Sequence, residues 1–119
     1  MKDNNKIIPV EISKHLKLKK VVIFGISNCV YCMKASELLN NLNVKPEMIN
    51  LDRNSNLKSN YKDIKDLLIK QTNNNDFPKI YFGTNYIGGY SDLYDLFTHN
   101  NLFEILKREN IDFIEEDFY

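Results

Sequence analysis

The sequence has no excess of either charge and no long apolar run, and both absences narrow its possible functions. Sixteen basic and sixteen acidic residues give a formal net charge of zero, so the chain has no overall field to attract nucleic acid or an anionic membrane. No segment stays apolar over the roughly 20 residues that a transmembrane helix needs. The first twenty residues also lack the apolar stretch of a signal peptide. We therefore expect a cytoplasmic protein with no nucleic-acid or membrane partner.

Cysteine is scarce: the chain has two, Cys29 and Cys32, three positions apart. Structural disulfides are rare in the cytosol, so a close pair is more consistent with a catalytic, redox-sensing or metal-binding role than with a permanent cross-link. A zinc site ordinarily needs further ligands, and the only histidines, His15 and His99, lie in separate polar segments without ligand-like spacing. We therefore expect no metal site and favour a redox role over a metal-binding or inert pair.

The length and composition indicate one domain over residues 1–119. Hydrophobic residues make up 43% of the chain and include seven Phe and seven Tyr, which suffices for one globular core. The polar N-terminal extension, residues 1–19, is expected to carry a short helix, because its apolar residues recur at helical spacing (Ile8, Ile12 and Leu16). The acidic and aromatic tail, residues 110–119, is expected to pack on the domain or stay unstructured, in preference to the alternative that it docks a partner.

The first half of the chain predicts a β-α-β unit. Residues 21–25 form a continuous β-branched and aromatic run that ends at glycine, which is typical of a strand buried on both faces. Residues 30–43 carry leucines and an alanine on one stripe, as an amphipathic helix does. Residues 47–51 form a second strand, whose pairing with the first should be parallel. The cysteine pair thus lies where the first strand turns into a helix.

The second half predicts a helix, a hairpin and two further helices. Residues 55–72 have apolar residues at helical spacing, and residues 79–82 and 86–87 flank a glycine-containing turn, as in a β-hairpin. Ser91 is expected to cap the next helix, and a last helix follows from Leu102. This order of elements predicts an α/β thioredoxin-like fold, a four-stranded mixed β-sheet flanked by helices on both faces.

A cysteine at a helix start has the setting that thiol chemistry needs. The thiolate is the reactive form, and an unperturbed thiol with a pKa near 8.5 is only about 3% ionised at neutral pH. Unpaired N–H groups and the positive end of the helix dipole would point at the Cys29 sulfur and lower its pKa. Cys32, one turn later, is close enough to attack a mixed disulfide held at Cys29. We therefore assign Cys29 as the nucleophile and Cys32 as the resolving thiol.

Two later segments suit a peptide-like ligand. Phe77 precedes Pro78 at the start of a strand, where a cis bond would leave the Phe77 backbone available to an extended peptide. Gly89 lets another backbone approach closely, and the helix start at Ser91 and Asp92 offers free N–H groups and one carboxylate. Together these groups suit a zwitterionic head group. Alone, this segment would be interpreted as a turn and a helix cap; the cysteine pair favours the binding interpretation.

Three segments between about residues 20 and 108 resemble those of the dithiol glutaredoxins: Cys29-Val30-Tyr31-Cys32, Phe77-Pro78-Lys79-Ile80-Tyr81-Phe82 and Ile87-Gly88-Gly89-Tyr90-Ser91-Asp92-Leu93. The resemblance implies that the first cysteine is the nucleophile and that the second resolves protein disulfides. It also implies a groove for glutathione, in which the residue before the proline pairs with the glutathione backbone and the segment after the glycines holds the γ-glutamyl end. The implied groove residues are Tyr31, Phe77, Pro78, Gly89, Ser91 and Asp92.

The chain departs from the family pattern around this groove. Ile26 occupies a position often held by lysine or arginine, and Asn75 stands where a basic residue or glutamine usually helps to bind the glycyl carboxylate. This predicts glutathione binding weaker by about 1–3 kcal/mol, unless Lys34 or Lys79 substitutes. Asp76 replaces the usual threonine, and a carboxylate near the nucleophilic sulfur opposes thiolate formation. We therefore expect slower catalysis, not an inactive protein.

The sequence predicts a monomeric, glutathione-dependent thiol–disulfide oxidoreductase with no bound cofactor, which reduces protein disulfides and glutathione mixed disulfides by a dithiol mechanism. Two alternatives stay open. One is a redoxin reduced by thioredoxin reductase, since some of these proteins carry valine after the first cysteine, as Val30 does here. The other is a dimeric carrier of a glutathione-ligated [2Fe–2S] cluster, since glutaredoxins without proline at this position include cluster binders. A thioredoxin proper is disfavoured because the chain has no tryptophan.

Overall fold

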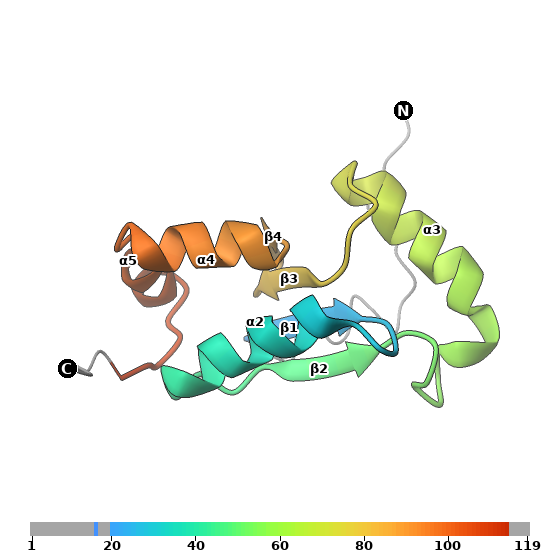
Figure 1. The fold of residues 1–119 in the computed structure, drawn as a ribbon, viewed down its shortest axis with the longest axis horizontal. Helices are drawn as coiled ribbons and strands as arrows, with labels where there is room; N and C mark the ends of the chain where they lie inside the picture. Colours follow the sequence, from blue (N-terminus) through green and yellow to red (C-terminus); the bar gives the residue numbers. More distant parts are fainter. Residues whose placement is uncertain (1–15, 17–19, 115–119) are drawn as a thin grey trace.

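The computed structural model describes Leu16 and residues 20–114, and its centre is a four-stranded sheet (Figure 1). The strands are β1 (Val21–Gly25), β2 (Glu47–Asn50), β3 (Lys79–Phe82) and β4 (Asn85–Gly88), in the spatial order β2-β1-β3-β4. β2 runs parallel to β1, while β3 runs antiparallel to both β1 and β4. The predicted mixed sheet and its β-α-β unit are therefore confirmed.

Helices cover both faces of the sheet, as predicted. They are α2 (Val30–Asn41), α3 (Tyr61–Thr72), α4 (Tyr90–Thr98) and α5 (Leu102–Arg108). α2, α4 and α5 lie on one side of the sheet, and α3 lies on the other (Figure 1). α3 begins later than the sequence suggested, because a short 3₁₀ turn, η2 (Lys58–Asn60), precedes it. Within the described part of the chain, no helix is both long and apolar enough to cross a membrane.

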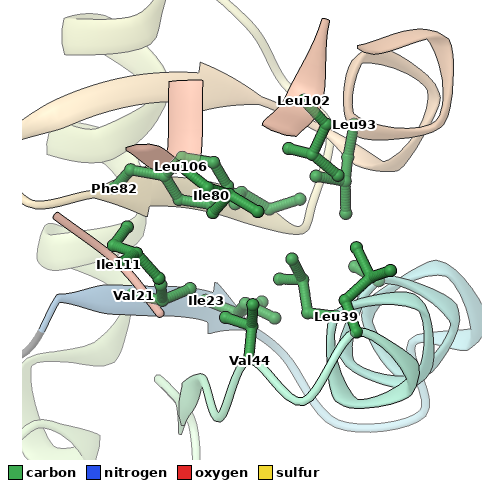
Figure 2. Packing of buried hydrophobic residues seen from close by; sticks show 12 residues of the cluster. Val21, Ile23, Leu39, Val44, Ile80, Phe82, Leu93, Leu102, Leu106 and Ile111 are labelled. Carbon is green, nitrogen blue, oxygen red and sulfur yellow. The ribbon is translucent and has the colours of Figure 1, made fainter. Parts of the chain in front are cut away.

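β1 is buried on both faces because it separates two hydrophobic clusters. Val21 and Ile23 belong to the cluster under α2, α4 and α5, while Val22 and Phe24 belong to the cluster under α3. Figure 2 shows the first of these clusters, in which Ile23 lies close to helical side chains such as Leu39. Burial on both sides explains why the strand is continuously apolar and not alternating. The two clusters fix the end of β1 and so place the cysteine pair that follows it.

The described part of the C-terminal tail packs on the domain. Ile111 is 6% exposed and belongs to the cluster of Figure 2. The Phe113 ring stacks on the Phe103 ring with 5.1 Å between centroids. These contacts attach the beginning of the tail to the layer that contains α5. Residues 115–119 and most of the helix expected in the N-terminal extension lie outside the described residues.

Candidate active site

The cysteine pair lies where β1 is followed by α2, as predicted. β1 ends at Gly25, and Cys29 is the N-cap of α2, with extended backbone angles (φ −103°, ψ 106°). Asn28 turns the chain into this position with a left-handed φ of 61°, which asparagine tolerates better than most residues. A disulfide joins Cys29 and Cys32, whose Cα atoms are 5.2 Å apart. The two sulfurs therefore meet at the start of α2.

The two cysteines differ in their accessibility to solvent. Cys29 is half-buried, whereas Cys32 is 1% exposed. An incoming disulfide can therefore reach the sulfur of Cys29 but not that of Cys32. The backbone N–H of Cys32 donates to Cys29 Sγ at 3.2 Å. A donor from the first turn of α2 is thus already directed at the accessible sulfur, where it would stabilise a negative charge.

Gly25 makes room for the buried sulfur. A Cβ added to Gly25 would lie 2.9 Å from Cys32 Sγ and 3.2 Å from Asn50 Oδ1. The first distance is closer than a packed Cβ tolerates, so a larger residue at position 25 would displace the Cys32 side chain. The glycine that ends β1 therefore allows Cys32 to pack against the sheet.

The segment before β3 lies against the cysteine turn. The Phe77–Pro78 peptide bond is cis, and the Phe77 carbonyl oxygen lies 3.8 Å from Cys29 Sγ. Pro78 is buried and leads directly into β3. A Cβ added to Gly89 would meet the Pro78 carbonyl oxygen at 3.5 Å. The structure therefore brings together the three segments that the sequence singled out.

A cavity of about 360 Å³ opens beside the cysteine turn. Its lining comes from α2, the loop before β3 and the start of α4: Tyr31, Asn74, Asp76, Phe77, Gly89, Tyr90, Ser91 and Asp92. Five of these residues were predicted to bind a ligand, and the sixth predicted residue, Pro78, is buried behind Phe77. The Tyr31 ring stacks on the Tyr90 ring with 5.9 Å between centroids. Tyr90, which the sequence did not indicate as a site residue, therefore adds a second tyrosine ring beside Tyr31 in the cavity wall.

The start of α4 forms one end of this cavity. Its N-cap is Gly89, whose N–H donates to Asp92 Oδ2 at 2.9 Å. The prediction that Ser91 caps the helix is therefore wrong: Ser91 lies in the first turn, and the carboxylate three residues after the N-cap makes the capping bond. Gly88 has a φ of 131°, and a Cβ there would overlap the Asp92 carboxylate. The first N–H groups of α4 have no intrahelical acceptor and can face a ligand.

The cavity lining is acidic. Asp76 and Asp92 both contribute to it, and none of its lining residues is basic. Asn74 lines the cavity, whereas Asn75 and Ile26, the two positions considered for carboxylate binding, do not.

In the part of the chain that the structure describes, no three His, Cys, Asp or Glu side chains gather as a possible metal site.

Neither lysine considered as a substitute cation lines the cavity. Lys79 is fully buried on β3, where its Nζ donates to the Asn74 carbonyl oxygen and lies 5.2 Å from the centre of the Phe77 ring. Burial lowers the pKa of the Lys79 ammonium. Lys34 Nζ lies 5.5 Å from the centre of the Tyr31 ring. Lys79 thus holds the loop before β3 in place and does not present its charge to a ligand.

The loop before Cys29 is held by a residue that the sequence reasoning missed. Asp52 follows β2, and its carboxylate accepts the Ser27 N–H at 3.1 Å. Arg53 Nε donates to Ser27 Oγ at 2.6 Å. The Ser27 side chain, with a smaller contribution from the Ser27 N–H, lowers the pKa of Asp52 below its usual 3.8. Because β1 and β2 are parallel, the residues that follow them meet at one edge of the sheet, and this rule was the available signal for Asp52.

Comparison with known proteins identifies the family. The Glutaredoxin family model matches residues 21–87, more than half of the chain. The chain belongs to the glutaredoxin family. Glutaredoxin-1 of Rhizophagus irregularis is 34% identical over 82 residues, which cover 69% of this chain and 77% of that protein. Glutaredoxin 1 of Rickettsia bellii is 33% identical over 93 residues, which cover 76% of this chain and 89% of that protein.

The fold agrees with this membership. The structure is similar to that of a buckwheat glutaredoxin in complex with glutathione, with a TM-score of 0.77 and 20% identity, covering 92% of this chain and 96% of that one. The region that matches the family model contains Cys29 and Cys32. This glutaredoxin is therefore a thiol–disulfide oxidoreductase whose redox-active pair is Cys29 and Cys32.

Proposed function

We propose that this glutaredoxin reduces protein disulfides and glutathione mixed disulfides by a dithiol mechanism, with glutathione as the reductant. Cys29 is the nucleophile, and Cys32 is the resolving thiol. The observation that carries the proposal is the unequal burial of the two sulfurs: Cys29 is half-buried beside the cavity, while Cys32 is 1% exposed. One sulfur can meet a substrate directly, and the other can act only from the interior.

The cavity offers groups that complement glutathione along its length. Near Cys29, the Phe77 backbone suits pairing with the peptide-like backbone of glutathione. At the other end, the first N–H groups of α4 suit the α-carboxylate of the γ-glutamyl group, and Asp92 suits its ammonium. The stacked rings of Tyr31 and Tyr90 provide an apolar wall. A buckwheat glutaredoxin of the same fold holds glutathione in its solved structure, and this supports the assignment.

The proposed cycle on a protein disulfide balances thiols and electrons. The Cys29 thiolate attacks one target sulfur, forms a mixed disulfide and releases the other target sulfur as a thiolate. Cys32 then loses its proton and attacks Cys29 Sγ, which releases the second target thiolate and forms the disulfide seen here. Two glutathione molecules reduce this disulfide and leave as glutathione disulfide. When the substrate is a glutathione mixed disulfide, Cys29 becomes disulfide-bonded to glutathione. A second glutathione can then reduce this mixed disulfide without Cys32.

Parallel coupled assays test the choice of reductant. A glutathionylated peptide and a protein disulfide serve as substrates, with either glutathione and glutathione reductase or thioredoxin reductase as the electron source. We expect turnover in the first system and none in the second. Turnover with thioredoxin reductase but not with glutathione would indicate a redoxin that thioredoxin reductase reduces, and the proposed reductant would be wrong.

Anaerobic purification tests the cluster-binding alternative and the oligomeric state. We propose that the protein acts as a colourless monomer in the cytoplasm, where the glutathione pool is kept reduced. Val30 is 61% exposed beside Cys29, so a second copy or another protein has access to this side of the sulfur. A brown dimer whose colour depends on glutathione would contradict the monomeric proposal and support a [2Fe–2S] carrier.

A further inference from the structure

A buried side-chain oxygen near the resolving cysteine has no hydrogen-bond partner. Asn50 Oδ1 is shielded from solvent, and among the described residues none donates a hydrogen bond to it. Buried polar atoms in folded proteins almost always have a partner, so an orphan acceptor needs a physical explanation. The dithiol cycle described above makes no use of this residue.

The position of Asn50 brings this oxygen close to Cys32. Asn50 is the last residue of β2 and pairs with Gly25, the last residue of β1. Because Gly25 has no side chain, one point beside its Cα lies 3.2 Å from Asn50 Oδ1 and 2.9 Å from Cys32 Sγ. The amide oxygen and the buried sulfur therefore flank the same small space.

We propose that Asn50 holds the resolving thiol in the reduced enzyme, with the Cys32 S–H donating a hydrogen bond to Asn50 Oδ1. The inference rests on the dithiol function proposed above. Two glutathione molecules break the Cys29–Cys32 bond, give up two electrons as they become glutathione disulfide, and release two protons. One proton goes to solvent, because Cys29 stays a thiolate, and the other forms the Cys32 thiol. The orphan acceptor thus gains a donor that the disulfide lacks.

This contact gives Asn50 a positioning role. It holds Cys32 Sγ beside the end of β1 and keeps the thiol protonated until a mixed disulfide forms at Cys29. It also stabilises the reduced state relative to the oxidised state, in which Oδ1 has no donor. A thiol is a weak donor, so a hydrogen bond in the lower part of the usual range of net strength is expected, which corresponds to a shift of about two- to five-fold in the equilibrium between the two states.

The infrared S–H stretching band of the reduced protein tests the contact directly. The chain has two cysteines, so at a pH where Cys29 is ionised the remaining band belongs to Cys32. We expect the wild-type band at the lowered frequency of a hydrogen-bonded thiol, and a higher frequency in Asn50→Ala. Asn50→Asp keeps an acceptor oxygen in place and should keep the band low. Asn41→Ala is the matched control, because Asn41 lines the same groove as Asn50 but is exposed.

Equilibration in glutathione redox buffers gives a second measurement. Asn50→Ala removes a contact present only in the reduced state, so its disulfide should be favoured about two- to five-fold relative to wild type. Asn41→Ala should leave the equilibrium unchanged. Either an unshifted S–H band or an unchanged equilibrium in Asn50→Ala overturns the inference, while normal glutathione turnover leaves the proposed function standing. If the protein did not exchange with glutathione at all, the proposed glutathione-dependent function would be wrong. The S–H band of Cys32 could still be measured in that case, after reduction of the disulfide by a phosphine.

Discussion

The backbone N–H of Cys32 donates a hydrogen bond to Cys29 Sγ at 3.2 Å. The donor belongs to the first turn of α2, where backbone N–H groups have no intrahelical acceptor. Once the disulfide is reduced, a donor in this position would favour the thiolate form of Cys29. Cys32 thus contacts Cys29 through its backbone as a donor, and in the proposed cycle its buried sulfur is also the resolving thiol.

Replacing Cys32 with serine should separate two activities. Removal of glutathione from a mixed disulfide needs only Cys29, so this activity should be largely retained. Reduction of a protein disulfide needs the second sulfur and should fall to the background rate. The turnover of a glutathione mixed disulfide and of a protein disulfide by Cys32→Ser measures the two activities separately. Cys29→Ser is the control and should lose both activities. Loss of both, or of neither, in Cys32→Ser would contradict the assigned roles.

Asp76 should give the site a preference for positively charged disulfides. Asp76 and Asp92 line the cavity, and no basic residue does. Charges a few ångström apart at a protein surface interact by about 1 kcal/mol. Asp76→Asn should therefore raise the rate constant for a small anionic disulfide by about two- to five-fold and lower that for a cationic one by a similar factor. The same substitution should strengthen binding of glutathione, which carries a net negative charge.

Stopped-flow measurements with an anionic and a cationic disulfide of matched size test this preference. Asp95→Asn is the control, because Asp95 is an exposed carboxylate of α4 that does not line the cavity, and its ratio of rates should match wild type. Added salt should shrink the effect of Asp76→Asn, since it screens exposed charges. If Asp76→Asn changed both rates in the same direction, the substitution would act on the reactivity of the Cys29 sulfur, and the proposed preference for cationic disulfides would be wrong.

Asp52→Asn should lower the free energy of unfolding near neutral pH but not in strong acid. Hydrogen bonding from Ser27, mainly through its side chain, lowers the pKa of the folded-state carboxyl below 3.8, so ionised Asp52 favours the folded state. This contribution is fully present above the unfolded-state pKa and is lost as the pH falls through the folded-state value. We expect a difference of less than about 1 kcal/mol, because solvent screens this carboxylate. Urea unfolding at about pH 6 and about pH 2 measures it; a difference that persists in acid contradicts the explanation.

Gly25→Ala should destabilise the oxidised protein by about 1–3 kcal/mol. The new Cβ would lie 2.9 Å from Cys32 Sγ, and Cys32 is almost fully buried. Gly89→Ala is the comparison, because its Cβ would meet only the Pro78 carbonyl oxygen at 3.5 Å, and its cost should stay below about 1 kcal/mol. Chemical unfolding measures the free energy of unfolding of both variants. Equal destabilisation would contradict the packing role given to Gly25.

The elements and the site segments were predictable because each depends on a short, contiguous pattern. β1 is recognisable as a central strand because a strand buried on both faces is continuously apolar, and Val22 and Ile23 do face opposite clusters. The site segments are equally local: cysteine at a helix start, Phe77 before Pro78, and Asp92 after two glycines. In the structure these local signals meet around one cavity.

The remaining features depend on contacts between distant segments. Asp92 and not Ser91 caps α4 because the backbone turns at the preceding glycines, and residue type alone does not specify that path. Lys79 looks available to a ligand in the sequence, yet β3 carries it into the interior, where it contacts the Asn74 carbonyl. In the sequence, Asn50 is an ordinary polar residue at the end of a strand. Only the fold shows that its side chain lies beside Gly25, next to the Cys32 sulfur.

The pH dependence of Cys29 alkylation in the reduced protein, with and without the unreactive analogue S-methylglutathione, shows whether the start of α2 activates Cys29 beside a glutathione-binding cavity. We predict half-maximal reactivity at least about one pH unit below the 8.5 of a free thiol, because the start of α2 stabilises the thiolate. The analogue should slow alkylation by occupying the cavity beside Cys29. Reactivity that rises only at or above about pH 8.5, with no protection by the analogue, would contradict the account.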